Sequence, residues 1–225
     1  MRIKIYQINH NRDSHQVKFE NLSHLEMFQG SPKVDASIYD EVFNAELDTD
    51  NLEALYAQFN TKGHPLHRGH SMSVSDVVVT PEGAFYCDSV GFTKVDFDES
   101  KTQKPDNLLK TVYVEPGKLP YEAEVLDTLE AKQKAVGGFI EPVYLGDDII
   151  LIGNEEAKLI GMQGNRHLDG GGIIAGPFFL LGDADSDFRS LTEDETKAMM
   201  ERFAEPEDIS PEEVEADTGF MFISM

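Results

Sequence analysis

The spacing of apolar residues predicts strands and helices in the first sixty residues. Residues 2–8 alternate apolar and polar side chains, which is typical of a strand. In residues 21–30 an apolar side chain recurs at every third position before a glycine, which indicates a short helix. Residues 37–47 favour a strand, although their spacing also suits a helical turn. Residues 52–59 carry apolar side chains at i, i+3, i+4 and i+7 and predict a helix with Asp50 as its N-cap.

Two β-type runs then indicate a hairpin. Residues 71–80 and 83–97 flank a Pro-Glu-Gly turn, and a loop rich in Gly, Pro and His precedes them at 61–70. Residues 98–110 lose the apolar pattern and collect charges and a proline, which predicts a linker.

The second half starts again with a predicted strand at 111–114. Pro120-Tyr121 leads into a predicted helix with Val125, Leu126 and Leu129 on its apolar face, ended by two glycines. Further β-type runs follow at 139–145, 148–154 with 157–162 after a turn, and 172–183. Thr192 with Glu195 three residues later forms a capping-box pattern at the start of a helix.

Both halves therefore mix strands and helices without strict alternation, which predicts an α+β fold of two small mixed sheet-plus-helix domains. The expected division is a domain at 1–98, a linker at 99–109, a second domain at 110–206, and an acidic C-terminal tail with an apolar end at 207–225.

Composition narrows the function. The chain has 225 residues, 40% of them hydrophobic, and can bury a sizeable core. Its 19 basic and 42 acidic residues give a net charge of −23, which argues against direct nucleic-acid binding and against binding to an anionic membrane. A single cysteine, Cys87, the lack of a secretory signal pattern in the first residues and the short longest apolar run (173–181) predict a cytoplasmic protein that does not span a membrane.

The acid is concentrated late in the chain. Residues 1–107 carry 17 acidic and 10 basic side chains, whereas residues 108–225 carry 25 and 9. We expect this region to contact a protein partner that has a basic surface, with solvation of the protein as the alternative role of the charge. The candidate partner-binding residues are Asp183, Asp185, Asp187, Glu193, Asp194, Glu195, Glu207, Asp208, Glu212 and Glu213.

Several motifs invite a chemical interpretation. His64, His67 and His70 stand three residues apart, but Pro65 prevents an ordinary helix from aligning them, so we expect surface loop histidines and no stoichiometric metal or other cofactor. The glycines of 170–176 precede a strand instead of a helix, which favours a turn over a dinucleotide site.

Three serines, Ser71, Ser73 and Ser75, share a spacing of two, which places them on one face of a strand or in a loop that caps the hairpin. No nucleophile-elbow sequence surrounds them, and no catalytic residue is predicted.

A polar group flanks the run at 157–162. Asn154, Glu155, Asn165 and Arg166 are candidates for a small-ligand pocket, since arginine is a good partner for a carboxylate or phosphate. The alternative is that these residues shape turns and pair with one another.

Two stretches resemble known families. Gly69, His70, Ser71, Ser73, Ser75 and Asp76 in Gly-His-Ser-x-Ser-Val-Ser-Asp-Val-Val, followed by Asp88, Gly91 and Phe92 in Tyr-x-Asp-x-x-Gly-Phe, are similar to the YodL-like domain over about residues 2–98. The runs VEPGKLPYEAEV, VGGFIEPVYL, IGNEEAKLIGMQGNR and IIAGPFFLLGD resemble a small uncharacterised domain family over about 110–206. The resemblance implies a setting in mobile elements and phages of Gram-positive bacteria, and no established chemistry.

The sequence therefore favours a non-enzymatic accessory protein of a mobile element that binds another protein. In its most concrete form, the protein is an acidic mimic of DNA that occupies the basic groove of a restriction or CRISPR enzyme. The alternative is a regulatory protein that binds a small ligand or nucleotide near Arg166.

Overall fold

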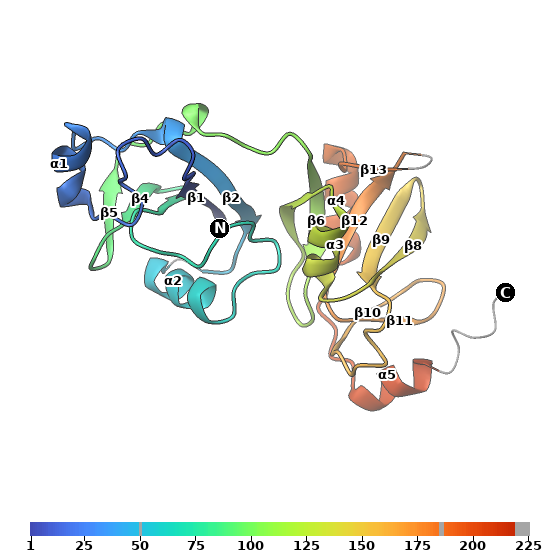
Figure 1. The fold of residues 1–225 in the computed structure, drawn as a ribbon. Coiled ribbons are helices and arrows are strands. Elements are labelled where there is room, and N and C mark those ends of the chain that lie inside the picture. The colour runs from blue at the N-terminus through green and yellow to red at the C-terminus, as the bar shows by residue number, and fades with distance from the viewer. Residues whose placement is uncertain (50, 185–186, 219–225) are drawn as a thin grey trace. The chain divides into compact units, whose positions relative to one another are not determined.

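The computed structural model describes residues 1–49, 51–184 and 187–218 (Figure 1). The chain divides into two compact units, residues 1–106 and 107–225. Each unit combines strands with helices, so the predicted α+β mixture is confirmed. None of the helices in the described ranges is long and apolar enough to cross a lipid bilayer.

The first unit is built on an antiparallel sheet in the order β5-β4-β3-β1-β2. Its strands are β1 (Arg2–Ile8), β2 (Tyr39–Glu46), β3 (Val77–Thr80), β4 (Gly83–Cys87) and β5 (Phe92–Val95). Its helices are α1 (Leu25–Gln29), α2 (Leu52–Thr61) and the short 3-10 helices η1 (Leu22–His24), η2 (Ala36–Ile38) and η3 (Glu99–Lys101). The predicted strand at 37–47, the helix at 52–59 and the Pro-Glu-Gly turn are confirmed. The runs beside the turn are shorter than predicted, because residues 71–76 are a loop and residues 83–97 divide into β4 and β5.

Helix α2 begins at a cap one residue later than predicted. The side chain of Asn51 accepts hydrogen bonds from the backbone N–H groups of Glu53 and Ala54. Asp50, the predicted cap, lies outside the described residues. Leu55 and Phe59 are the buried side chains of α2, and the Phe59 ring lies 5.0 Å from that of Phe43 on β2, so α2 packs against the sheet.

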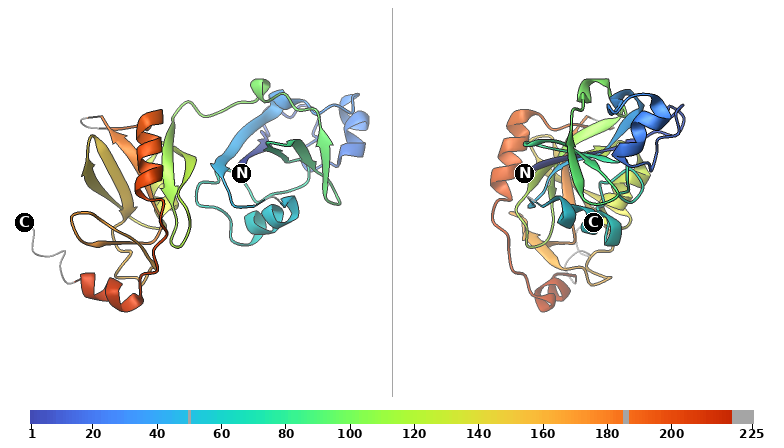
Figure 2. Two further views of the ribbon diagram at one scale, coloured as in Figure 1. Left: turned by 180° about the vertical axis from the view of Figure 1, so that it is seen from behind. Right: turned by 90° about the vertical axis from the view of Figure 1, so that its left-hand side faces the viewer.

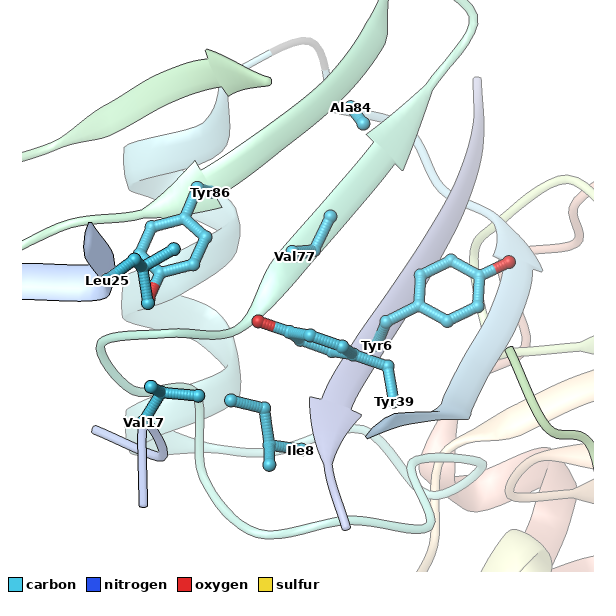
Figure 3. Close-up of a cluster of buried hydrophobic side chains, with 8 residues drawn as sticks. All are labelled: Tyr6, Ile8, Val17, Leu25, Tyr39, Val77, Ala84 and Tyr86. Carbon is cyan, nitrogen blue, oxygen red and sulfur yellow. The ribbon is translucent and has the colours of Figure 1, made fainter. Parts of the chain in front are cut away.

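A core of aromatic and aliphatic side chains holds the other face of this sheet (Figure 3). It is formed by Tyr6, Ile8, Val17, Leu25, Tyr39, Val77, Ala84 and Tyr86. Because side chains alternate along a strand, Gln7 points away from Tyr6 and Ile8, toward the opposite face.

The second unit has an antiparallel sheet in the order β7-β6-β12-β9-β8, with β13 beside β12 and a separate β10-β11 pair. The strands are β6 (Leu108–Val114), β7 (Tyr121–Leu126), β8 (Ile140–Gly146), β9 (Ile149–Asn154), β10 (Gly164–His167), β11 (Ile173–Ala175), β12 (Phe178–Asp183) and β13 (Phe188–Arg189). The helices are α3 (Leu129–Val136), α4 (Glu193–Arg202) and α5 (Pro211–Thr218).

Helix α4 covers one face of this sheet, as the left view in Figure 2 shows. Met199, Met200 and Phe203 pack on a buried cluster that includes Val112 and Phe178. On the opposite face, the Tyr113 hydroxyl donates to the carbonyl oxygen of Ala135 in α3. Helix α5 instead packs beside β11 through Val214, together with Ile209 from the segment before the helix.

Three sequence predictions are corrected here. Residues 121–126 are strand β7, and helix α3 starts only at Leu129, capped by Thr128. Residues 157–162 form a turn, not a strand. Within the expected linker at 99–109, η3 and a bridge from Gln103 to Asp40 belong to the first unit, and β6 already begins at Leu108.

Candidate functional site

The Gln7 amide organises the loop that carries the family motif of the first unit. Its Oε1 accepts a hydrogen bond from the backbone N–H of His70 at 3.0 Å. Its Nε2 donates to the carbonyl oxygen of His70 at 2.9 Å and to Oδ2 of Asp76 at 2.8 Å. Gln7 is buried, so these bonds satisfy a polar group that would otherwise be costly inside the unit.

The same bonds determine the tautomer of His70. Its Nδ1 lies 2.7 Å from the carbonyl oxygen of Ser71, which can only accept, so Nδ1 carries the proton. Both protons of the Gln7 amide already have acceptors. The Nε2 of His70 is buried without a hydrogen-bond partner among the described residues.

Asp76 is buried at the end of this loop. Its Oδ2 accepts from Gln7 and, at 2.8 Å, from the backbone N–H of Ser73, whereas Oδ1 has no hydrogen-bond partner within the described chain. Burial raises the pKa of this carboxyl from 3.8 to about 7, because the hydrogen bonds and the positive charge of Lys18 offset only part of the desolvation.

The three motif serines lie in a loop before β3, which corrects their placement on one face of a strand and leaves the capping loop as the alternative that holds. Ser75 has a positive φ of 80°, and its Oγ accepts from the N–H of Phe19, itself at a φ of 70°. The Tyr39 hydroxyl donates to the Ser75 carbonyl at 2.9 Å. The motif thus builds a closed loop, in which the Ser75 hydroxyl and the backbone groups of Ser71, Ser73 and Ser75 make the hydrogen bonds that hold it.

The end of the motif forms the turn between β4 and β5. The N–H of Asp88 donates to the carbonyl oxygen of Gly91, which has a positive φ of 70°, and the Asp88 carboxylate accepts from the N–H of Ser89. The Phe92 ring contacts that of Tyr56 on α2. These residues also have structural tasks.

Gly69 shows why the motif begins with glycine. A Cβ atom built there would lie 1.9 Å from Oε1 of Gln7, so any side chain would push the amide from its bonds. We expect Gly69→Ala to lower the free energy of unfolding by about 1–3 kcal/mol, as for other overpacked sites. Gly170→Ala, where a Cβ meets nothing within 4 Å, is the matched control in a chemical-denaturation experiment. Equal effects of the two changes would contradict this role of Gln7.

The histidine loop is buried, not exposed, which corrects the expectation of surface histidines for His64 and His67. The His64 ring stacks on Phe59 and meets Phe43 edge-on, and its Nδ1 accepts from the N–H of Leu66. Because His64 and His67 are packed in the core beside α2, they do not form an open site. In the described part of the chain, no three His, Cys, Asp or Glu side chains are grouped so that they would hold a metal ion.

A charged cluster in the first unit had no signal in the sequence. Glu41 on β2 is 3% exposed and lies 3.6 Å from Arg68 and 3.2 Å from Lys104. The Tyr6 hydroxyl donates to Glu99 at 2.6 Å, which also pairs with Lys4 at 2.7 Å. The two carboxylates and three cations compensate one another, so the cluster ties β1 and β2 to later segments.

The predicted ligand group of the second unit is used internally. The guanidinium of Arg166 is buried and donates to the carbonyl oxygens of Asn165 at 2.9 Å, Lys118 at 2.8 Å and Phe203 at 3.1 Å. The Asn165 amide donates to the carbonyls of Val114 and Gly176. These side chains join β10 to β6 and to the end of α4, as the pairing alternative expects, and a role in ligand binding stays a prediction.

Asn154 also makes hydrogen bonds within the unit, whereas Glu155 does not take part in them. The Asn154 amide donates to the carbonyl of Val136 and accepts from the N–H of Glu156, and it fills the space left by Gly138. Glu155 is exposed. The four predicted ligand residues therefore do not converge on one site.

The acidic candidates fall into two groups. Glu195 closes the capping box of α4 and pairs with Arg189 at 2.7 Å, Glu207 pairs with His167, and Glu213 caps α5 through Ser210. Exposed carboxylates, by contrast, are Asp187, Glu193, Asp194, Asp208 and Glu212. Asp183 is half-buried, and Asp185 lies outside the described residues.

Helix α4 carries three exposed carboxylates, Glu193, Asp194 and Glu201, and the exposed Lys197 lies one helical turn from Glu193 and from Glu201. Met199, Met200 and Phe203 instead face the sheet. We call these three carboxylates the α4 acidic face.

Two cavities of about 810 Å³ each lie in the second unit. The first, which we call the turn-α5 cavity, lies between the turn at 157–162 and the segment 208–215. The second contains two of the predicted ligand residues, Asn154 and Glu155, in its wall, together with Glu141, Lys158 and Asp217. Helix α5 was not predicted from the sequence, although Ser210, Pro211 and Glu213 are a capping-box signal for its start.

Comparisons with known families match both halves. A family model described as a YodL-like domain matches residues 2–97, and a model described as a domain of unknown function (DUF3846) matches residues 109–204. No curated protein and no solved structure matches the chain.

Proposed function

We propose that this protein is a non-enzymatic accessory protein of a bacterial mobile element that binds another protein through a basic surface of that partner. The main support is that residues 108–225 contain 25 acidic and only 9 basic residues. In addition, several of the basic side chains are already paired within the unit. Lys118, Lys132, Lys158, Arg189 and Arg202 each pair with a carboxylate of the same unit. The α4 acidic face is exposed to solvent or to a partner, and Lys197 adds one positive charge beside it.

The charge favours a steering role. A surface of one sign accelerates the encounter with a partner of the opposite sign, and its effect weakens as salt is added. The packed helix fixes the backbone positions from which these exposed carboxylates project, and a nucleic acid likewise carries its phosphates along a regular backbone. In its finer form, the proposal is that the partner is a nucleic-acid enzyme of the host and that α4 occupies its DNA groove.

The test uses a variant and a matched control. The variant carries Glu193→Gln, Asp194→Asn and Glu201→Gln. The control removes the same charge from exposed sites of the first unit through Glu26→Gln, Glu82→Gln and Asp96→Asn. Proteins from a Gram-positive lysate that the wild-type chain retains at 0.1 M salt and releases at 1 M are identified by mass spectrometry, because the Debye length falls from ~10 Å to ~3 Å over this range.

We expect the α4 variant to associate with such a partner about three- to tenfold more slowly than the wild type, with a smaller change in dissociation. The control variant should associate at close to the wild-type rate. Duplex DNA should displace the chain if the partner is a nucleic-acid enzyme. Full affinity of the α4 variant would show that the acidity only solvates the protein.

A second candidate is a small-ligand regulator, which the second cavity favours. Glu141, Glu155 and Asp217 surround a single lysine there, and the Lys158 ammonium already pairs with Asp217 at 2.6 Å. Carboxylates repel phosphate groups, so this cavity suits a small organic cation better than a nucleotide.

A further inference from the structure

We infer that the turn-α5 cavity receives a segment of the partner protein that combines a large apolar side chain with lysine or arginine. This inference rests on the proposed function and names the place on the chain where the partner binds. The cavity measures about 810 Å³, within the range of roughly 300–1,000 Å³ that is usual for binding cavities. It takes a partner side chain together with neighbouring backbone.

The apolar wall is rigid and incompletely covered. Ile209 and Val214 are buried in the cluster that joins α5 to β11, and Met162 packs against it. Leu159, at the edge of the cavity, is 71% exposed. Hydrogen bonds hold its turn, from the N–H of Ile160 to the Glu156 carbonyl and from that of Met162 to the Ala157 carbonyl, both at 2.9 Å. Leu159 is thus presented to solvent by a preformed turn, which lowers the cost of binding.

The mouth of the cavity is negative. Asp208 and Glu215 line it, both are exposed, and neither pairs with a basic side chain in the described ranges. The one lysine in the wall, Lys158, is neutralised by Asp217 at 2.6 Å. An apolar centre with a charged rim is the arrangement in which buried side chains supply affinity and rim charges select the partner.

Other occupants match only part of this chemistry. Nucleic acids and anionic membranes carry the same sign of charge as the rim. A second copy of the chain has a net charge of −23 and is repelled as well. The last seven residues of the sequence, GFMFISM, are apolar but contain no lysine or arginine. A basic and apolar segment satisfies both the wall and the rim.

The test titrates the full chain with a labelled dodecapeptide of four Leu-Lys-Lys repeats. Methyl NMR spectra report the site, and fluorescence polarisation reports the affinity. We expect shifts at the methyl groups of Met162, Leu159 and Val214. A peptide with serine in place of leucine, and one with glutamate in place of lysine, should each bind at least about tenfold more weakly.

Two neighbouring side chains provide a matched pair of variants. Leu159→Ser should weaken peptide binding about tenfold, because a leucine side chain no longer becomes buried. Ile160 is 58% exposed on the same turn but does not line the cavity, so Ile160→Ser should change the affinity less than twofold. Both sites are exposed, so both variants should fold.

The outcomes separate this inference from the proposed function. Equal effects of the two serine variants, or peptide shifts only at α4, would overturn the cavity assignment while leaving a basic partner in place. Cavity shifts without any salt-sensitive protein partner would overturn the proposed function instead. Shifts at the cavity methyls together with a selective loss in Leu159→Ser support the inference.

Discussion

Replacing Arg166 with methionine is expected to lower the free energy of unfolding by about 3 kcal/mol or more. The guanidinium donates to the carbonyl oxygens of Asn165, Lys118 and Phe203, and Arg166 is only 2% exposed. Methionine fills similar space but leaves three carbonyl groups without their donor, at about 1–3 kcal/mol for each that stays dry.

Lysine at this position should not rescue stability. It keeps the charge but lacks the planar fork that reaches acceptors on three segments. The control is Arg202→Met, which removes a pair with Asp169, an 86% exposed carboxylate, and should cost less than about 1 kcal/mol. Because the chain has no tryptophan, urea unfolding is best followed by circular dichroism. Wild-type stability in both Arg166 variants would contradict this structural role of Arg166.

The second large effect is a dependence of stability on pH that originates at Asp76. Burial raises the pKa of its carboxyl from 3.8 to about 7 in the folded chain. Below about pH 4 the group is protonated in both the folded and the unfolded chain, and its contribution is fully present. Between about pH 4 and pH 7 the unfolded chain releases the proton while the folded chain retains it, so about 4 kcal/mol of stability is lost over this range at 1.36 kcal/mol per pKa unit.

Asp76→Asn tests this dependence because an amide does not ionise. Its oxygen accepts from Gln7 and Ser73 in place of Oδ2. The free energy of unfolding of the wild type should fall by about 4 kcal/mol more than that of the variant between pH 3 and pH 8. Asp96→Asn removes an exposed carboxylate as the control. Parallel pH profiles for the wild type and Asp76→Asn would disprove the raised pKa.

The sequence predicted correctly those elements that are determined by interactions among neighbouring residues. The Pro-Glu-Gly turn requires only its own residues, and Gly83 has a φ of 130° that suits glycine. The capping box at Thr192 is likewise complete within four residues, and both of its hydrogen bonds are present. These elements were therefore predictable without knowledge of the rest of the fold.

Residues 121–126 were not predictable in this way. Tyr121, Ala123 and Val125 are buried at every second position, a strand pattern, but Val125 also stands four residues before Leu129 and so mimics a helix face. Pairing with β6, where Tyr113 lies opposite Tyr121, decides between the two periods. The pairing strand β6 lies outside residues 121–126, so the pattern of these residues alone could not show that they form a strand.

The internal contacts of the candidate residues were not predictable for the same reason. Arginine in a polar stretch suggests a ligand, and the acceptors that use it come from residues 118 and 203, far along the chain. His64 looks like a loop residue, and only the fold brings Phe43 and Phe59 against it. The excess of acidic residues in the second half, by contrast, can be counted from the sequence and does not depend on the fold.

The buried position of Cys87 allows local opening of the first unit to be measured by cysteine alkylation. The thiol lies at the end of β4, beside the backbone bonds that join Cys87 to Ser75 and Asp76. It is 3% exposed, and burial raises its pKa to about 12, so an alkylating reagent meets almost no thiolate in the closed state. We therefore expect alkylation to require that β4 separates from the loop at residues 69–76. The rate of alkylation of this single cysteine therefore measures how often that loop opens.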